Sequence, residues 1–271
     1  MRLSVQDVRF GYGGDGREVL RGVTFDYASP DVCCLLGHNG VGKSTLLECI
    51  IGANSPTGGR VLLDGRDVGS YRPRELALKF AYIPQTHQPT FSYKVLDVVT
   101  MGRTSRMGYL AMPGPEDVDY AREQLDYLGI GHLAERPYTN ISGGERQLVM
   151  IASALAQAPD ALILDEPTAH LDFGNQYRFV ELVGRLHARG IGVLMTTHFP
   201  DHALMLGCTT VVLSEGRVVA SGPARDVVTE ESMAAIYGIE VHMAQVGDRT
   251  VCVPGPLDGG PAVSNGTEVR V

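Results

Sequence analysis

A glycine-rich segment near the start of the chain ends in a lysine and a serine. It covers residues 37–44 and fits the spacing G-x-x-x-x-G-K-S. In such a loop, glycines let backbone N–H groups approach phosphate oxygens, the lysine reaches the β and γ phosphates, and the hydroxyl ligates Mg²⁺. The segment therefore predicts a site for nucleotide phosphates. Its predicted contacts are Gly37, His38, Asn39, Gly40, Val41, Gly42, Lys43, Ser44 and Thr45.

The segments on either side of this loop fit such a site. Val32–Leu36 is a short apolar run and is predicted to be a buried strand. Residues 45–51 are predicted to continue as a helix that stops at Gly52, with its positive N-terminal end facing the phosphates. The alternative is a glycine-rich turn that matches by chance, and the flanking strand and helix disfavour it.

Two adjacent carboxylates follow a second apolar run. Ala161–Leu164 is predicted to be a core strand that ends at Asp165 and Glu166, because Pro167 prevents it from continuing. Beside a bound nucleotide, Asp165 can hold a metal directly or through water, and Glu166 can polarise a water molecule aimed at the γ-phosphate. A surface turn is the alternative for this segment alone, but the phosphate loop favours the catalytic interpretation.

The phosphate loop and the carboxylate strand also occur together in kinases, helicases and GTPases. A third segment distinguishes between these classes of protein. Residues 141–145, Ile-Ser-Gly-Gly-Glu, precede an apolar helix predicted over residues 148–155 and resemble the signature motif L-S-G-G-Q of the ATP-binding cassette (ABC) family. Ile141 replaces leucine at similar volume, and Glu145 replaces glutamine. A helix opened by a hydroxyl and glycine N–H groups can receive a γ-phosphate. The predicted contacts here are Ser142, Gly143, Gly144 and Glu145.

The resemblance implies a fold and a mode of assembly. The expected fold is α/β: a P-loop NTPase of the ABC type with a RecA-like core, an antiparallel β subdomain and an α-helical subdomain. Two copies are expected to pack head to tail and to hold two ATP molecules, each between the phosphate loop of one copy and the signature of the other. ATP then joins the copies and hydrolysis releases them. ATP and Mg²⁺ are the expected ligands.

Other markers of the family occur in the expected order. By resemblance, Tyr12 stacks on adenine, Gln85 contacts Mg²⁺ and the lytic water, and Asp172 lies in a loop that makes contacts across the dimer. His198 matches the switch histidine that holds the γ-phosphate and positions the catalytic glutamate. The implied catalytic residues are Glu166, His198 and Gln85, and the implied metal contacts are Ser44, Gln85 and Asp165.

Taken singly, several of these residues have simpler explanations. Tyr12 could be a half-buried strand aromatic, and Gln85 a solvated loop residue. His198 and His202 have the spacing of a helical metal site, but Pro200 between them argues against a regular helical face. Their consistent order along the chain favours the family interpretation.

Composition narrows the expected partners and compartment. The 271 residues carry a net charge of −8, which disfavours a nucleic-acid surface. The five cysteines show no metal-ligand spacing, and an odd number without a pattern fits a reducing cytosol. We expect neither a membrane-spanning helix nor a signal peptide, because the sequence has no apolar run of about 18 residues and no charged leader. Any role at a membrane is expected to come through a partner.

The domain organisation follows from changes in pattern along the chain. We expect one ABC ATPase domain over residues 1–245, with a helical subdomain at about 87–157. Residues 246–271 are expected to form a C-terminal extension whose tail, from about residue 254, lacks a core pattern and is mobile.

The periodicity differs between the parts of this domain. Residues 1–30 and 58–70 alternate apolar and polar side chains, which predicts antiparallel strands. From about residue 158, strands and helices alternate as in a parallel α/β fold.

Two further segments resemble the ATPase subunits of iron-chelate, haem and cobalamin importers. They are residues 95–103 and residues 221–239. The resemblance implies a peripheral subunit on the cytoplasmic face of the cell membrane, bound to a transmembrane permease dimer. It also implies, indirectly, an extracytoplasmic substrate-binding protein. Molybdate, zinc and manganese systems use the same scaffold, and the cargo does not touch an ATPase subunit, so the substrate is left open.

Three other functions share part of these motifs. A soluble ABC protein that acts in an assembly process, such as iron–sulfur cluster assembly, would share every nucleotide residue. A P-loop small-molecule kinase would leave Ser142, Gly143 and Gly144 unexplained. A GTPase is disfavoured because no N-K-x-D motif occurs. An importer ATPase is the favoured interpretation.

Overall fold

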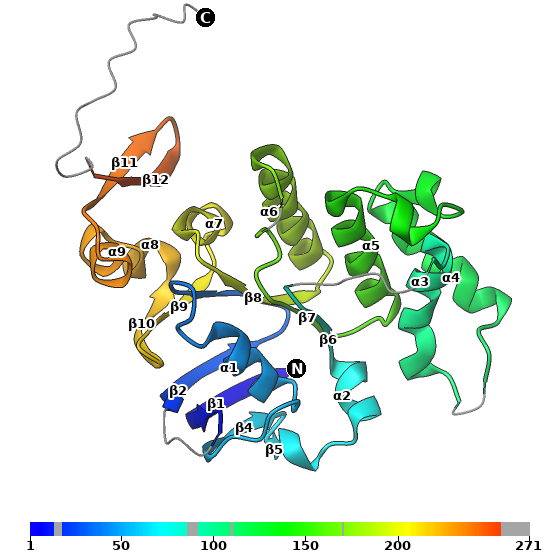
Figure 1. Cartoon of the computed structure of the whole chain (residues 1–271), viewed down its shortest axis with the longest axis horizontal. Helices are drawn as coiled ribbons and strands as arrows, with labels where there is room; N and C mark the ends of the chain where they lie inside the picture. Colours follow the sequence, from blue (N-terminus) through cyan, green and yellow to red (C-terminus); the bar gives the residue numbers. More distant parts are fainter. Residues whose placement is uncertain (14–17, 86–91, 109–110, 170, 256–271) are drawn as a thin grey trace, which may run out of the picture.

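A computed structural model describes residues 1–13, 18–85, 92–108, 111–169 and 171–255 of the chain. Its centre is a six-stranded sheet in the order β10-β9-β3-β8-β7-β6 (Figure 1). Strands β9, β3, β8, β7 and β6 run parallel, and β10 pairs antiparallel with β9. The α/β fold is therefore confirmed. The strands are β3 (Val32–Leu36), β6 (Phe80–Ile83), β7 (Ala161–Leu164), β8 (Gly192–Thr197), β9 (Thr209–Ser214) and β10 (Arg217–Pro223).

The central strands are apolar runs because both faces of the sheet are covered. Every residue of β3, β7 and β8 is buried. Helix α1 (Lys43–Ile50) lies on one side of the sheet, and α6 (Phe173–Ala188) and α7 (Pro200–Leu206) lie on the other (Figure 1). Since β3, β8 and β7 are parallel neighbours, the loops after them meet at one edge, where open α/β sheets bind ligands.

A second, four-stranded antiparallel sheet covers α1 from below in Figure 1, in the order β2-β1-β4-β5. Leu3 and Val5 of this sheet share one buried cluster with Leu46 and Ile50 of α1. The antiparallel strands predicted near the N-terminus are therefore confirmed. They are β1 (Arg2–Gly11), β2 (Glu18–Ala28), β4 (Gly58–Leu63) and β5 (Arg66–Asp67).

A helical region occupies one end of the molecule (Figure 1), as predicted. It contains α3 (Val95–Met101), α4 (Pro115–Tyr127) and α5 (Gly143–Ala156). One face of α5 packs with α3 and α4, and another packs through Ile151 and Leu155 onto the central sheet. Helix α5 therefore fixes the signature segment relative to the sheet. The connecting elements are α2 (Pro73–Lys79) and the 3-10 turns Val68–Ser70, Gly102–Arg106, Gly131–Leu133 and Tyr138–Asn140.

The C-terminal part contains α8 (Ala224–Val227), α9 (Glu230–Tyr237) and a hairpin of β11 (Val241–Val246) and β12 (Arg249–Pro254). The boundary predicted at residue 245 falls inside this hairpin, and Val241, Met243 and Cys252 pack with α9. Residues 246–254 therefore continue the domain and do not begin a separate extension. The predicted mobile tail lies almost entirely outside the described residues. Among the described helices, none has the length and apolar character to cross a bilayer.

Candidate active site

The loop after β3 has the backbone conformation that its glycines allow. Gly40 and Gly42 have φ angles of 81° and 105°, in the left-handed region that favours glycine. A Cβ atom at Gly42 would lie 2.9 Å from Leu20 Cδ2, so a side chain there would also clash with β2. Val41 is buried beneath the loop. Helix α1 begins directly at Lys43, as a phosphate site requires.

A cavity of about 440 Å³ lies over this loop. It combines the loop with residues that follow β1, β6 and β7 and with one residue of β2, which are far apart in the sequence. Nine of the predicted site residues are therefore brought together here. Those that line the cavity are Tyr12, Asn39, Gly40, Gly42, Lys43, Ser44, Thr45, Gln85 and Glu166.

Lys43 is buried and pairs with the predicted catalytic carboxylate. Its Nζ atom donates to the carbonyl oxygens of Gly37 and His38, at 2.8 and 3.1 Å, and lies 2.9 Å from Glu166 Oε1. The side chains of Lys43 and Glu166 are only 4% and 9% exposed. The three N–H groups of Lys43 are thus matched by three partners, so its Nζ atom must give up at least one of them to bind a phosphate.

The other predicted catalytic side chains, Gln85 and His198, also lie close to the Glu166 carboxylate. Gln85 Nε2 donates to Glu166 Oε2 over 3.3 Å. His198 Nδ1 lies 3.3 Å from the same oxygen, although it is not aligned for a hydrogen bond. Glu166 has a φ of 43°, an uncommon value for a residue with a side chain. The strand tip therefore holds Glu166 at a bend where Lys43, Gln85 and His198 can all reach it.

Thr196 is a residue of this site that the sequence analysis missed. Its hydroxyl donates to Asp165 Oδ1 and accepts from the Glu166 backbone N–H, both at 2.7 Å. Thr196 is fully buried near the end of β8, where Met195 pairs with Leu164. The hydroxyl thus fixes both carboxylate residues from the neighbouring strand. The signal was the pair of threonines just before His198 in an otherwise apolar strand.

The groups suited to a metal ion are all oxygen donors. Ser44 offers a hydroxyl, Asp165 a carboxylate and Gln85 a side-chain carbonyl. These are the ligands that Mg²⁺ prefers, together with phosphate and water oxygens. Asp165 is buried and does not line the cavity, but Thr196 joins it to Glu166, which does. The donor set therefore fits Mg²⁺.

Tyr12 lies at the mouth of the cavity with an exposed ring. Its side chain is 56% exposed, and its hydroxyl lies 3.1 Å from Thr45 Oγ1 and donates to Glu48 Oε2 over 3.0 Å. The ring meets Phe10 edge to face at 5.0 Å between centroids. These contacts tie Tyr12 to α1, and its stacking on adenine remains a prediction.

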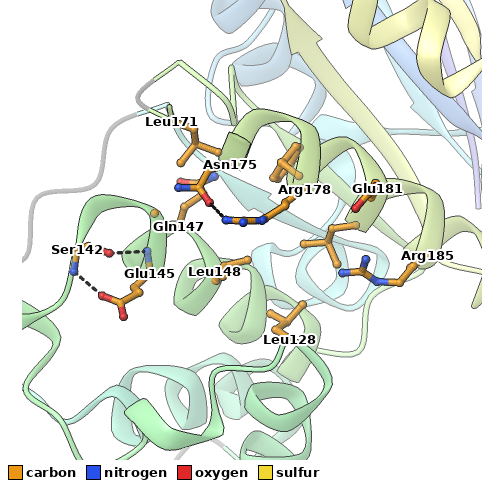
Figure 2. A pocket seen from close by; sticks show the side chains of 13 residues that line it. Leu128, Ser142, Glu145, Gln147, Leu148, Leu171, Asn175, Arg178, Glu181 and Arg185 are labelled. Carbon is orange, nitrogen blue, oxygen red and sulfur yellow. Dashed lines mark hydrogen bonds between the residues drawn. The ribbon is translucent and has the colours of Figure 1, made fainter. Parts of the chain in front are cut away.

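Ser142, Gly144 and Glu145 of the signature line a different cavity, of about 460 Å³, between α5 and α6 (Figure 2). Among the described residues, the two cavities share no lining residue. Ser142 caps α5: its hydroxyl accepts from Glu145 N over 3.3 Å, and its own N–H donates to Glu145 Oε2 over 2.7 Å. Glu145 is thus half of a reciprocal capping box, a role that glutamine can also fill.

Asp172 lies beside the signature. It caps α6, because Oδ1 accepts from Asn175 N over 2.8 Å and Oδ2 accepts from Asn175 Nδ2 over 2.9 Å. A Cβ atom at Gly144 would lie 3.5 Å from Asn175 Nδ2. The structure therefore groups Ser142, Gly144 and Asp172 with one another and separately from the phosphate loop.

The match to a known family agrees with this geometry. A family model described as "ABC transporter" matches residues 20–169, more than half of the chain. The chain belongs to the ABC transporter family. ATP binding and ATP hydrolysis characterise this family, so this ABC protein is an ATPase.

Several relatives match over most of the chain. An uncharacterized ABC transporter ATP-binding protein of Haemophilus influenzae is 40% identical over 88% of this ABC protein and 89% of its own length. The molybdate import ATP-binding protein MolC of the same species is 33% identical over 90% of each chain. The hemin import ATP-binding protein HmuV of Rhodococcus jostii is 37% identical over 88% of this chain and 82% of its own.

A solved structure shares the whole architecture. It is an inward-facing conformation of an ABC transporter described as metal-chelate type. It is 32% identical to this ABC protein, covers 94% of this chain and 97% of its own, and has a TM-score of 0.81. The fold predicted from the resemblance is therefore confirmed.

The capping box of this ABC ATPase leads to a prediction about pH. The hydrogen bond from the Ser142 N–H lowers the pKa of the Glu145 carboxyl below its usual range. A lowered folded-state pKa stabilises the protein above the ordinary pKa, and this stability is lost as the pH falls through the folded value. We expect Glu145→Gln to lower the free energy of unfolding by less than about 1 kcal/mol at pH 7, because the cap remains and only the charge at the helix N-terminus is lost.

Urea unfolding of both proteins between pH 7 and pH 4 measures this difference. It should stay constant down to about pH 5 and shrink at lower pH. Glu123→Gln, at an exposed position in the middle of α4, removes the same charge without a cap and is the control. A difference that grows as the pH falls would contradict the prediction.

Proposed function

We propose that this chain is the ATP-hydrolysing subunit of an importer for a metal-chelate substrate of the iron-siderophore, haem or cobalamin type. Two similarities support this substrate class: one relative is named for hemin import, and the solved structure is described as metal-chelate type. The relative named for molybdate import has a lower identity to this chain than the hemin protein, at 33% against 37%, but it matches a larger share of its own length, 90% against 82%. The description of the solved structure therefore decides our preference for a chelated metal over an oxyanion.

The observation that carries the mechanism is the division of the site between two cavities. Lys43 and Glu166 line one cavity, and Ser142 and Gly144 line the other. One chain thus carries two different halves of a nucleotide site. Two copies packed head to tail would complete two sites, each formed by the phosphate loop of one copy and the signature of its partner. This supports an ATP-driven closure of a homodimer.

The residues of the phosphate-loop half would act in order. Lys43 binds the β and γ phosphates and releases Glu166, which then accepts a proton from the water that attacks the γ-phosphate. Gln85 orients this water, and His198 holds the γ-phosphate and fixes Glu166. Mg²⁺, held by Ser44 and by Asp165 directly or through water, would neutralise the charge that develops on the phosphates. Tyr12 would stack on the adenine.

The signature half would act on the nucleotide of the partner copy. Ser142 and the first N–H groups of α5 would contact its γ-phosphate, because a helix N-terminus favours an anion. Asp172 lies beside them and would contact the partner copy. Closure would pull on a permease dimer in the membrane, with the ATPase on its cytoplasmic face, and an extracytoplasmic binding protein would deliver the cargo.

An affinity isolation from gently solubilised native membranes tests this function. The bait is the Glu166→Gln protein with ATP, which should hold the dimer closed, and the Lys43→Ala protein is the comparison that should not close. A polytopic membrane protein recovered in near-equal amount with both baits supports the importer subunit and identifies the permease. Recovery of soluble partners alone, with no membrane protein above background, would overturn the importer and favour an assembly factor.

A further inference from the structure

A tyrosine near the end of the domain donates a hydrogen bond to the backbone of His198. Tyr237 is the last residue of α9, and its hydroxyl donates to His198 O over 2.8 Å. Tyr237 is half-buried and packs on a cluster that contains Leu36, the residue before the phosphate loop. A tyrosine hydroxyl is protonated at neutral pH, and burial raises the pKa of Tyr237 further, so the hydroxyl is a donor. We propose that Tyr237 is a positioning residue for His198 in ATP hydrolysis, an inference that rests on the role proposed for His198.

No aligned hydrogen bond from a described residue holds Nδ1 of the His198 imidazole, so ring packing and the backbone orient it. Its Nδ1 atom is close to Glu166 without an aligned hydrogen bond, and its ring packs on Phe199 at 4.0 Å between centroids. The turn itself is held locally, since Thr197 Oγ1 accepts from Phe199 N and lies 3.2 Å from His202 Nδ1. Because the peptide group is planar, a bond to His198 O fixes the plane that follows its Cα atom. The Tyr237 hydroxyl therefore restrains the direction in which the His198 side chain points from the backbone.

The position of Tyr237 is fixed in turn by the C-terminal hairpin. Glu230 Oε1 in α9 accepts from Met243 N in β11 over 2.7 Å. Cys252 N in β12 donates to Asp201 Oδ1 in α7 over 2.8 Å. Since α7 begins just after His198, these contacts form a closed path from His198 through α7, the hairpin and α9 back to His198. The hairpin is thus part of the support for the active site.

The test is the Tyr237→Phe variant, which removes only the hydroxyl. We expect kcat for ATP hydrolysis to fall about five-fold, the effect of one neutral hydrogen bond, with KM unchanged. Tyr71→Phe is the matched control. The Tyr71 hydroxyl likewise donates to a backbone carbonyl, Leu63 O at 2.7 Å, but this carbonyl belongs to β4 of the antiparallel sheet. This control variant should lower thermal stability to a similar extent and leave kcat unchanged.

Two further measurements separate positioning from general stability. The NMR resonances of the labelled His198 imidazole should shift in Tyr237→Phe and not in Tyr71→Phe. In a His198→Ala background, Tyr237→Phe should lower the residual kcat no further. Wild-type kcat and unshifted His198 resonances in Tyr237→Phe would overturn this inference and leave the role of His198 intact. Full hydrolysis by His198→Ala would instead overturn the role of His198.

Discussion

We expect the Glu166→Gln protein to hydrolyse ATP about a thousand-fold more slowly than the wild type, the scale of a lost general base. The amide keeps the volume of the carboxylate and can still accept from Gln85, but it cannot take a proton from water. ATP binding should remain, since Lys43 and the loop backbone are unchanged. Steady-state hydrolysis and equilibrium ATP binding measure the two properties separately, and light scattering with ATP should detect the trapped dimer.

The control for this substitution is again Glu123→Gln, which makes the same chemical change on the exposed face of α4. It should hydrolyse ATP at the wild-type rate. If Glu166→Gln retained a rate within about ten-fold of the wild type, the loss would be too small for a general base. The base would then have to be sought elsewhere, and Glu166 would be reduced to a partner of Lys43.

The second large effect is expected for Lys43→Ala, which removes a buried cation from both the phosphate site and the ion pair. The affinity for ATP should fall about 100-fold, the effect of one strong charged hydrogen bond. The substitution should also lower the free energy of unfolding by about 3 kcal/mol, because the buried carboxylate of Glu166 loses the lysine that balances its charge. Titration calorimetry with ATP and urea unfolding check the two effects.

Lys79→Ala is the matched control for Lys43. Its Nζ atom pairs with Asp64 at 2.9 Å and Asp160 at 3.6 Å, but all three side chains are more than one third exposed. The loss of stability should therefore stay below about 1 kcal/mol, with no change in ATP affinity. Adding Glu166→Gln to Lys43→Ala should restore part of the lost stability, because it removes the unpaired charge. Unchanged ATP affinity in Lys43→Ala would contradict its role as the phosphate ligand.

The parts of the site that were predicted from the sequence are those encoded by local pattern. The strand before the phosphate loop and the strand before Asp165 have the predicted bounds, because each is a short apolar run closed by a strong turn or break. The parallel order of these strands then brings Lys43 and Glu166 together. The convergence of Gln85 and His198 on Glu166 also agrees with the resemblance, although their chemical roles remain predictions.

Two of the contacts that were missed join segments that only tertiary packing brings together. Thr196 acts on Asp165 across two paired strands, and Tyr237 reaches His198 from a later helix. The hairpin β11–β12 was missed although Gly247 and Asp248 form a two-residue turn between alternating strands, a recognised signal. The capping box of Ser142 and Glu145 also has a local signal, S-x-x-E, but it overlaps the signature motif, which predicts phosphate contacts for the same residues.

The separation of the two cavities has a genetic consequence if the copies pair as proposed. A copy without Glu166 still presents an intact Ser142, and a copy without Ser142 still presents an intact Glu166. When these two copies meet, one of their two composite sites contains both defects and the other contains neither. Two inactivating alleles of a single gene would thus restore ATP hydrolysis when both are expressed in one cell. Either allele alone would give an inactive protein.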